Sequence, residues 1–112
     1  MDANVLAELR HLQEHGRPRL IHEMLTTFRG DAPQRLAEMR AAVSASDSDR
    51  LKKAAHQLKG VAGSLGARRL AALCAQLEQN GHGGIPQNAA ALLADAEIQF
   101  EKACAVLEAQ TR

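Results

Sequence analysis

Apolar residues recur every three or four positions along almost the whole chain, which is the spacing of amphipathic α-helices. Glycine, proline and small polar residues interrupt this spacing around residues 16–18, 44–49, 66 and 80–86. Five helices are therefore predicted, at about residues 3–14, 18–44, 47–65, 67–80 and 86–110. No segment alternates with the two-residue period of a β-strand, so an all-α fold is predicted.

The second predicted helix contains two residues that commonly interrupt helices, Gly30 and Pro33. Its apolar positions nevertheless keep helical spacing across both of them: Ile21, Leu25, Phe28, Ala32, Leu36, Met39 and Val43. Proline removes one backbone hydrogen bond and crowds the preceding turn, which bends a helix. We therefore predict one helix that starts near Pro18 and is kinked near residues 30–33, rather than two helices.

Each of the three following helices carries one apolar stripe. The stripes are Leu51, Ala55, Leu58, Ala62 and Leu65, then Leu70, Leu73, Cys74 and Leu77, and finally Ala89, Leu93, Ala96, Phe100, Ala103 and Leu107. Asp47 or Ser48 is suited to cap the first of these helices, and Pro86 to open the last. Only a tight turn at Gly66 joins helices 47–65 and 67–80, so they are expected to be antiparallel neighbours.

These four long helices predict an antiparallel up-and-down four-helix bundle, with residues 81–84 as a flexible glycine loop. The first helix, with Val5, Leu6, Leu9 and Leu12, is too short to be stable alone. We expect it to lie as a lid at one end of the bundle.

Composition supports a single domain over residues 1–112, because the chain has the usual length of one domain and is rich in helix-forming residues. Phe28 and Phe100 are its only aromatic residues. Cys74 and Cys104 both fall at apolar helical positions without a metal-binding spacing, so buried free thiols are predicted.

The formal net charge is +1 with acids and bases interspersed, which argues against nucleic acid or an anionic membrane as partners. The sequence shows neither a run of about 20 apolar residues nor the basic and apolar pattern of a signal peptide. A cytoplasmic monomer is predicted, either as a free protein or as the cytosolic end of a membrane-bound sensor kinase.

Among five histidines, His56 alone has a position that suggests chemistry. At about 100° per residue it lies about 140° from the apolar stripe of its helix, so an exposed ring is predicted. His11 and His15 are four residues apart, but the sequence places no third metal ligand beside them, and no metal site is predicted. His22 and His82 have no partner pattern.

Gly60 and Gly63 share the outward sector of His56, although a glycine inside a helix costs about 1 kcal/mol relative to alanine. One explanation is close helix packing or a frayed helix end. The other is a bare backbone that lets a partner and a bulky anion approach the ring.

Charged side chains near His56 complete the candidate site. An exposed neutral imidazole is a nucleophile, and Lys59, with Lys52, can place positive charge beside a phosphoryl group on the ring. In a hairpin that turns near Gly66, Glu78 comes level with His56 and can accept a hydrogen bond from one ring nitrogen. A solvated glutamate without such a role is the equal alternative.

These residues resemble a known family. Ala55-His56-Gln57-Leu58-Lys59-Gly60, Gly63-Ser64-Leu65-Gly66-Ala67, Leu70, Leu73-Cys74 and Leu77-Glu78 are similar to the histidine-containing phosphotransfer (HPt) domain. The similarity extends upstream through Phe28, Pro33 and Leu36, and so covers about residues 20–80, whereas the last helix matches only in pattern.

The resemblance implies that His56 accepts a phosphoryl group from the aspartate of a receiver domain and passes it to another receiver. It also implies that Lys59 lies by the phosphoryl group, that Gly60 leaves space for it, and that Glu78 occupies a position often filled by Gln or Glu. Lys52, Lys53, Gln57 and Gly63 are expected to contact the partner.

The resemblance further implies that the Mg²⁺ needed for transfer is bound by the receiver, so no cofactor is expected on this chain. The sequence has no nucleotide-binding motif, and kinase activity of its own is not expected. Two alternatives stay open: direct phosphorylation of His56 by a sensor histidine kinase, and a helical adaptor that binds receivers without transfer.

Overall fold

The computed structural model describes residues 1–80, 84–85 and 87–111, and within these ranges the regular structure is entirely helical. The helices are α1 (Ala3–Glu14), α2 (Leu20–Ser44), α3 (Ser48–Ser64), α4 (Arg68–Asn80) and α5 (Ala89–Ala109). The predicted all-α fold with five helices is confirmed. The glycine loop at 81–83, His82, and the predicted start of the last helix at Pro86 lie outside the described residues.

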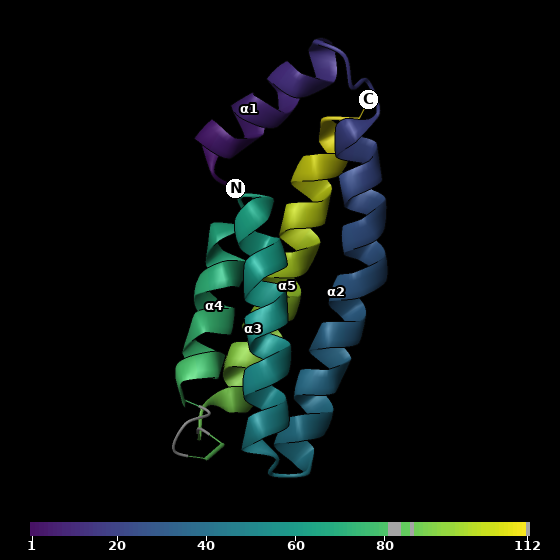
Figure 1. Cartoon of the computed structure of the whole chain (residues 1–112). Helices are drawn as coiled ribbons and strands as arrows, with labels where there is room; N and C mark the ends of the chain where they lie inside the picture. The colour runs from purple at the N-terminus through teal and green to yellow at the C-terminus, as the bar shows by residue number, and fades with distance from the viewer. Residues whose placement is uncertain (81–83, 86, 112) are drawn as a thin grey trace.

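Helices α2 to α5 form an antiparallel four-helix bundle, in which each helix packs against two others, α2 on α3, α3 on α4, α4 on α5 and α5 on α2 (Figure 1). The apolar stripes predicted for α3, α4 and α5 are all buried in one core. In α2 the core position after Met39 is Ala42, whereas the predicted Val43 is only partly buried. Phe28 and Phe100 meet edge to face at 5.0 Å, which joins α2 to α5.

The helix ends differ from the predicted ones by a few residues. α2 begins at Leu20 and not at Pro18, because Pro18 and Arg19 form a turn that is closed by a hydrogen bond from Leu20 N to Arg17 O. α2 then continues through Gly30 and Pro33 as one helix, as predicted, and a kink there stays a prediction. Asp47 caps α3 by accepting from Arg50 N.

The last helix also starts later than predicted, at Ala89, because Gln87 and Asn88 form a turn before it. It ends at Ala109, one residue before the predicted end. α3 is one residue shorter than predicted at each end, without residues 47 and 65, and α4 starts one residue later than predicted, without residue 67.

Helix α1 lies across one end of the bundle, as predicted for a lid (Figure 1). Its first turn is fixed to the α3–α4 turn by a hydrogen bond from Asp2 N to Gly66 O at 2.7 Å. Its last turns contact the start of α2 and the end of α5, where Gln13 accepts from Ile21 N and donates to Gln110 O. Only one side of α1 meets the bundle, so Leu9 is buried, whereas Leu12 is 44% exposed.

The α3–α4 turn is tight because Gly66 adopts φ +77°, a left-handed conformation that side chains with a Cβ rarely adopt. A Cβ at this position would lie 2.9 Å from Cβ of Val5, so glycine is also required for close approach of α1. This turn sets α3 and α4 side by side and thereby positions the site described next.

Candidate functional site

His56 lies in the middle of α3 and faces solvent, with 66% of its side chain exposed. Its neighbours Ala55 and Leu58 point into the core and are fully buried. The exposure predicted from the helical wheel is therefore confirmed, and the ring is available to a partner.

Glu78 on α4 binds one nitrogen of this ring. Its Oε1 lies 2.8 Å from Nδ1 of His56, and only 16% of its side chain is exposed. An ionised carboxylate can only accept, so Nδ1 carries the proton of the neutral imidazole and Nε2 keeps its lone pair. The predicted approach of Glu78 to His56 is confirmed.

Lys59 binds the second oxygen of the same carboxylate, with Nζ 2.6 Å from Oε2 of Glu78. The hydrogen bond from Lys59 lowers the pKa of Glu78, partial burial opposes this effect, and the hydrogen bond from His56 lowers the pKa further. Glu78 is therefore ionised at neutral pH. The sequence predicts Lys59 on the outward side of α3 beside the ring, but it does not predict this ion pair with Glu78. We call His56, Lys59 and Glu78 the acceptor cluster.

Gly60 and Gly63 lie on the exposed side of α3, where a Cβ on either residue would meet no atom within 4 Å. Close helix packing therefore does not explain these glycines, and fraying does not explain Gly60, which lies one turn before the end of α3 at Ser64. Ser64 Oγ donates to the carbonyl of Gly60. The bare backbone next to His56 is open to an approaching molecule.

The other residues predicted to contact a partner surround His56. Lys53 and Gln57 are exposed, whereas Lys52 is partly buried. Gln57 accepts from Arg35 Nη1 at 3.2 Å, and the same guanidinium pairs with Asp31 and Glu38. This α2 cluster was not predicted, because no sequence pattern shows which side of α2 faces α3.

The sequence pattern of the Hpt domain family matches residues 23–110. The chain belongs to the Hpt domain family. It is also similar to a solved structure, histidine-containing phosphotransfer protein B from Pseudomonas aeruginosa PAO1, with 32% identity and a TM-score of 0.86 over 99% of this chain and 93% of that chain. Hpt domains are the phosphotransfer intermediates of phosphorelays, which agrees with the resemblance seen in the sequence.

Curated relatives agree with this assignment. The chain is 48% identical to the sensor protein TorS of Escherichia coli K12 over 59 residues, which cover 53% of this chain and 6% of TorS. It is 32% identical to histidine-containing phosphotransfer protein 2 of Arabidopsis thaliana over 75 residues, which cover 64% of this chain and 48% of that protein. The matched segments thus span at most about half of these relatives.

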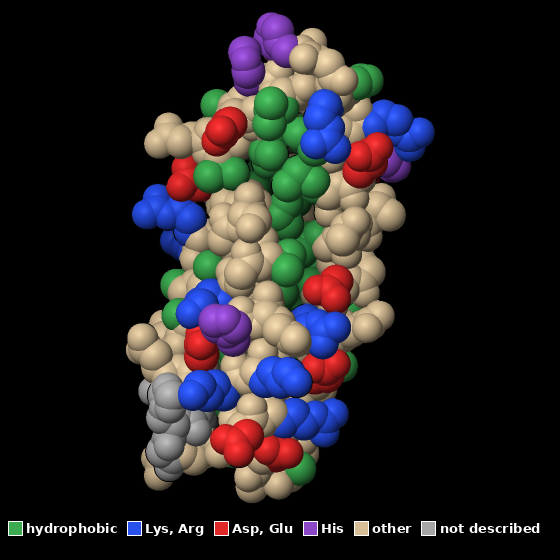
Figure 2. Space-filling view, in the orientation of Figure 1, with side chains coloured by type: hydrophobic (Ala, Val, Ile, Leu, Met, Phe, Trp, Pro, Cys, Tyr) green, Lys and Arg blue, Asp and Glu red, His purple; other side chains and the backbone are tan. Residues whose placement is uncertain are grey.

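A mainly apolar groove of about 330 Å³ lies between the first half of α2 and the end of α3 of this Hpt domain. Leu20, Met24, Phe28, Val61 and Leu65 line it. Figure 2 shows a band of apolar side chains on one part of this face, and basic and acidic side chains interspersed on another part. The groove therefore gives one part of this face an apolar character.

The remaining chemistry-bearing side chains of the Hpt domain lie apart from the acceptor cluster or beneath it. Cys74 and Cys104 are buried free thiols, as predicted, and burial raises the pKa of Cys74 to about 12. His11 and His15 stack at 4.2 Å, and no group of three potential metal ligands occurs in the described part of the chain. Nor is any helix in that part long and apolar enough to cross a membrane.

Proposed function

We propose that Nε2 of His56 accepts a phosphoryl group from a receiver-domain aspartate and donates it to the aspartate of another receiver. The observation that carries this proposal is the exposed ring whose Nδ1 is bound to Glu78, because this leaves the lone pair of Nε2 directed outwards. The lone pair attacks phosphorus, the bond between phosphorus and the aspartyl oxygen breaks, and the carboxylate leaves with the electron pair. Donation is the reverse reaction.

The three members of the acceptor cluster have different roles in this proposal. Glu78 orients the ring and stabilises the positive charge that develops on it as Nε2 forms its new bond. Lys59 is held by Glu78 at 2.6 Å in the resting state, and it moves to the phosphoryl oxygens when these arrive beside it. Gly60, one turn from His56, leaves the space that the phosphoryl group fills.

The receiver docks across α2 and α3 in this proposal. Its apolar side chains cover the groove between Met24 and Val61, and its polar rim meets Lys52, Lys53 and Gln57. Gly60 and Gly63 permit close approach between these two regions. The receiver also supplies the Mg²⁺ that neutralises charge during transfer, so this chain contributes a positioned nucleophile and no kinase activity. We assign this exchange to the cytoplasm, where its partners are expected.

A sensor histidine kinase is a second candidate donor, because the exposed ring is equally open to a kinase domain that carries ATP. A receiver-binding adaptor without transfer is disfavoured, because it would need neither the orientation of His56 by Glu78 nor an open Nε2.

The test is transfer of ³²P from a receiver that has been phosphorylated with acetyl phosphate. We expect acid-labile, base-stable label on the wild-type chain and none on His56→Gln, with an unchanged melting temperature because the ring is exposed. His22→Gln is the matched control, since His22 is exposed on α2 and is expected to have no role. Label that persists on His56→Gln would overturn the assignment. Label from ATP and a kinase alone would favour the second donor.

A further inference from the structure

Arg35 on α2 is bound by two carboxylates of its own helix. Its Nη2 lies 3.4 Å from Oδ1 of Asp31, and its Nη1 lies 3.0 and 3.1 Å from the two carboxylate oxygens of Glu38. Asp31 is four residues before Arg35 and Glu38 three residues after it, so the three side chains share one side of α2. Only 23% of the Arg35 side chain is exposed. Because carboxylates hold the planar guanidinium on two sides, it is a fixed group and not a mobile surface charge.

This guanidinium also reaches α3, where it binds Gln57. Nη1 of Arg35 donates to Oε1 of Gln57 at 3.2 Å. A guanidinium can only donate, so the amide of Gln57 must turn its oxygen towards Arg35 and its nitrogen away from it. Gln57 is exposed, and its Nε2 has no hydrogen-bond acceptor in the described part of the chain. Two N–H donors are therefore directed outwards from the residue next to His56.

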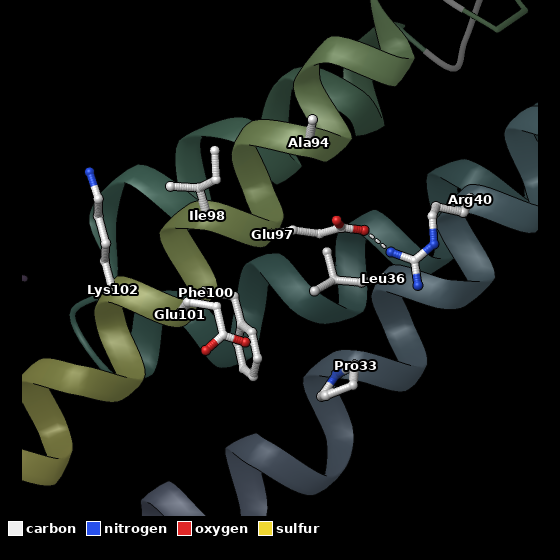
Figure 3. A pocket seen from close by; sticks show the side chains of 9 residues that line it. All are labelled: Pro33, Leu36, Arg40, Ala94, Glu97, Ile98, Phe100, Glu101 and Lys102. Atoms are coloured by element: carbon white, nitrogen blue, oxygen red, sulfur yellow. Dashed lines mark ion pairs between the residues drawn. The ribbon is translucent and has the colours of Figure 1, made fainter.

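Arg40, a second arginine of α2, makes a simpler connection between helices. It pairs with Glu97 of α5 (Figure 3), and 53% of its side chain is exposed. The carboxylate of Glu97 can only accept, so this ion pair joins two helices without directing any donor outwards. Arg40 therefore shows what an arginine between helices does when it orients no further group, and it serves as a reference for Arg35.

We propose that Arg35 is a positioning residue, which holds the amide of Gln57 so that both of its N–H groups meet an oxygen atom of the docked receiver. This inference rests on the proposed function, in which Gln57 belongs to the polar rim of the docking surface. It adds the chemical class of the receiver group. A carbonyl, hydroxyl or carboxylate oxygen beside the phosphorylated aspartate fits, whereas a lysine or arginine there would place donors against donors. An amide that is already oriented loses less conformational freedom on binding, so Arg35 strengthens docking.

Gln57→Glu tests the N–H donors. Glutamate has nearly the same shape and still accepts from Arg35, but it has no N–H group to offer a receiver. Docking contacts act equally before and during transfer, so we expect the half-saturating receiver concentration to rise about five-fold and the rate at saturation to stay unchanged. The measurement is rapid-quench transfer from a phosphorylated receiver that labels the wild type. Gln76→Glu is the matched control for the added charge and should behave like the wild type, because Gln76 is exposed on α4 and, two residues before Glu78, lies on another side of that helix.

Arg35→Met tests the positioning. Without the guanidinium the amide of Gln57 is no longer oriented, so the half-saturating concentration should rise about three-fold in the wild-type background and should not rise further in a Gln57→Ala background. Arg40→Met is the matched control, because it also removes an ion pair between helices, and it should transfer like the wild type. Urea unfolding measures stability separately, because a merely structural arginine would change the free energy of unfolding and not this coupling to Gln57.

The possible failures are distinguishable. An unchanged half-saturating concentration for Gln57→Glu would overturn this inference and leave the role of His56 intact. An equal rise for Arg35→Met in both backgrounds would mean that Arg35 acts without Gln57, and would also overturn it. If no phosphorylated receiver labels the wild type, the proposed function fails, and this inference fails with it.

Discussion

Replacing Glu78 tests how much its hydrogen bond to His56 contributes to transfer. Only a ring whose Nε2 is unprotonated and directed outwards can attack phosphorus, and the hydrogen bond from Nδ1 to Glu78 at 2.8 Å selects that state. A hydrogen bond to a charged group contributes about 1.5–3 kcal/mol. Because 66% of the imidazole is exposed, solvent reduces this to about 1 kcal/mol. Loss of the bond should therefore lower the productive fraction about five-fold.

We accordingly expect Glu78→Ala to slow phosphoryl acceptance about five-fold at saturating receiver, and Glu78→Gln, whose amide oxygen still accepts from Nδ1, to slow it about two-fold or less. Rapid-quench measurement with a phosphorylated receiver gives these rates. Glu8→Ala is the control, because Glu8 is exposed on α1. Nitrogen-15 chemical shifts of the ring report its tautomer independently. Wild-type rates for Glu78→Ala would refute the orienting role.

The same carboxylate should contribute to acid stability. Hydrogen bonds from Lys59 and His56 lower the pKa of Glu78 in the folded state below that of the unfolded chain, although burial opposes them. The ionised group thus stabilises the fold above its unfolded pKa of about 4.3, and this contribution is lost as pH falls through the lower folded pKa. Urea unfolding between about pH 5 and pH 3 should therefore show a steeper loss of stability for the wild type than for Glu78→Gln. Equal slopes would contradict the network.

Three further predictions concern the glycines and the buried thiol. Gly60→Gln should slow transfer more than Gly63→Gln, because position 60 is closer to the phosphoryl group, and neither variant should lose stability. Transfer kinetics and urea unfolding measure these two effects. Wild-type transfer rates for both variants would exclude docking across this surface. Gly66→Ala should lower the free energy of unfolding by about 2 kcal/mol, because it strains a left-handed turn and displaces Val5, whereas Gly60→Ala should not lower it. Burial raises the pKa of Cys74 to about 12. Its thiol should therefore react with thiol reagents at pH 8 about a thousand-fold more slowly in the native chain than in the unfolded chain. Fast labelling of the native chain would disprove the burial of Cys74.

The long helices could be predicted because each repeats its apolar spacing over several turns, so that one unusual residue such as Pro33 does not obscure the pattern. Helix ends depend on single local contacts, and the turn closed by Leu20 N and Arg17 O shifted the start of α2. α1 is short and touches the bundle on one side only, so spacing alone did not show that Leu12 would be exposed.

The acceptor cluster was predictable in part for a similar reason. Helix geometry and a tight hairpin together determine which residue of α4 is level with His56, and this gave Glu78 correctly. Lys59 has a long flexible stem with several acceptors in reach, so its pairing with Glu78 could not be derived from position. Arg35 comes from another helix, and its contact with Gln57 depends on how α2 is rotated against α3.

His56 and Glu78 are 22 residues apart in the sequence and equidistant from Ala67, in the turn that joins their helices. Equal numbers of residues on the two sides of the turn therefore bring His56 and Glu78 to the same level of the α3–α4 hairpin. One residue inserted into α4 before Glu78 would rotate every later side chain by about 100° and shift it by about 1.5 Å along the axis. The carboxylate of Glu78 would then no longer lie level with His56. Length changes between Gly66 and Glu78 are thus expected to slow phosphoryl acceptance at least as much as Glu78→Ala does, whereas changes after α4 leave the spacing of His56 and Glu78 unaltered.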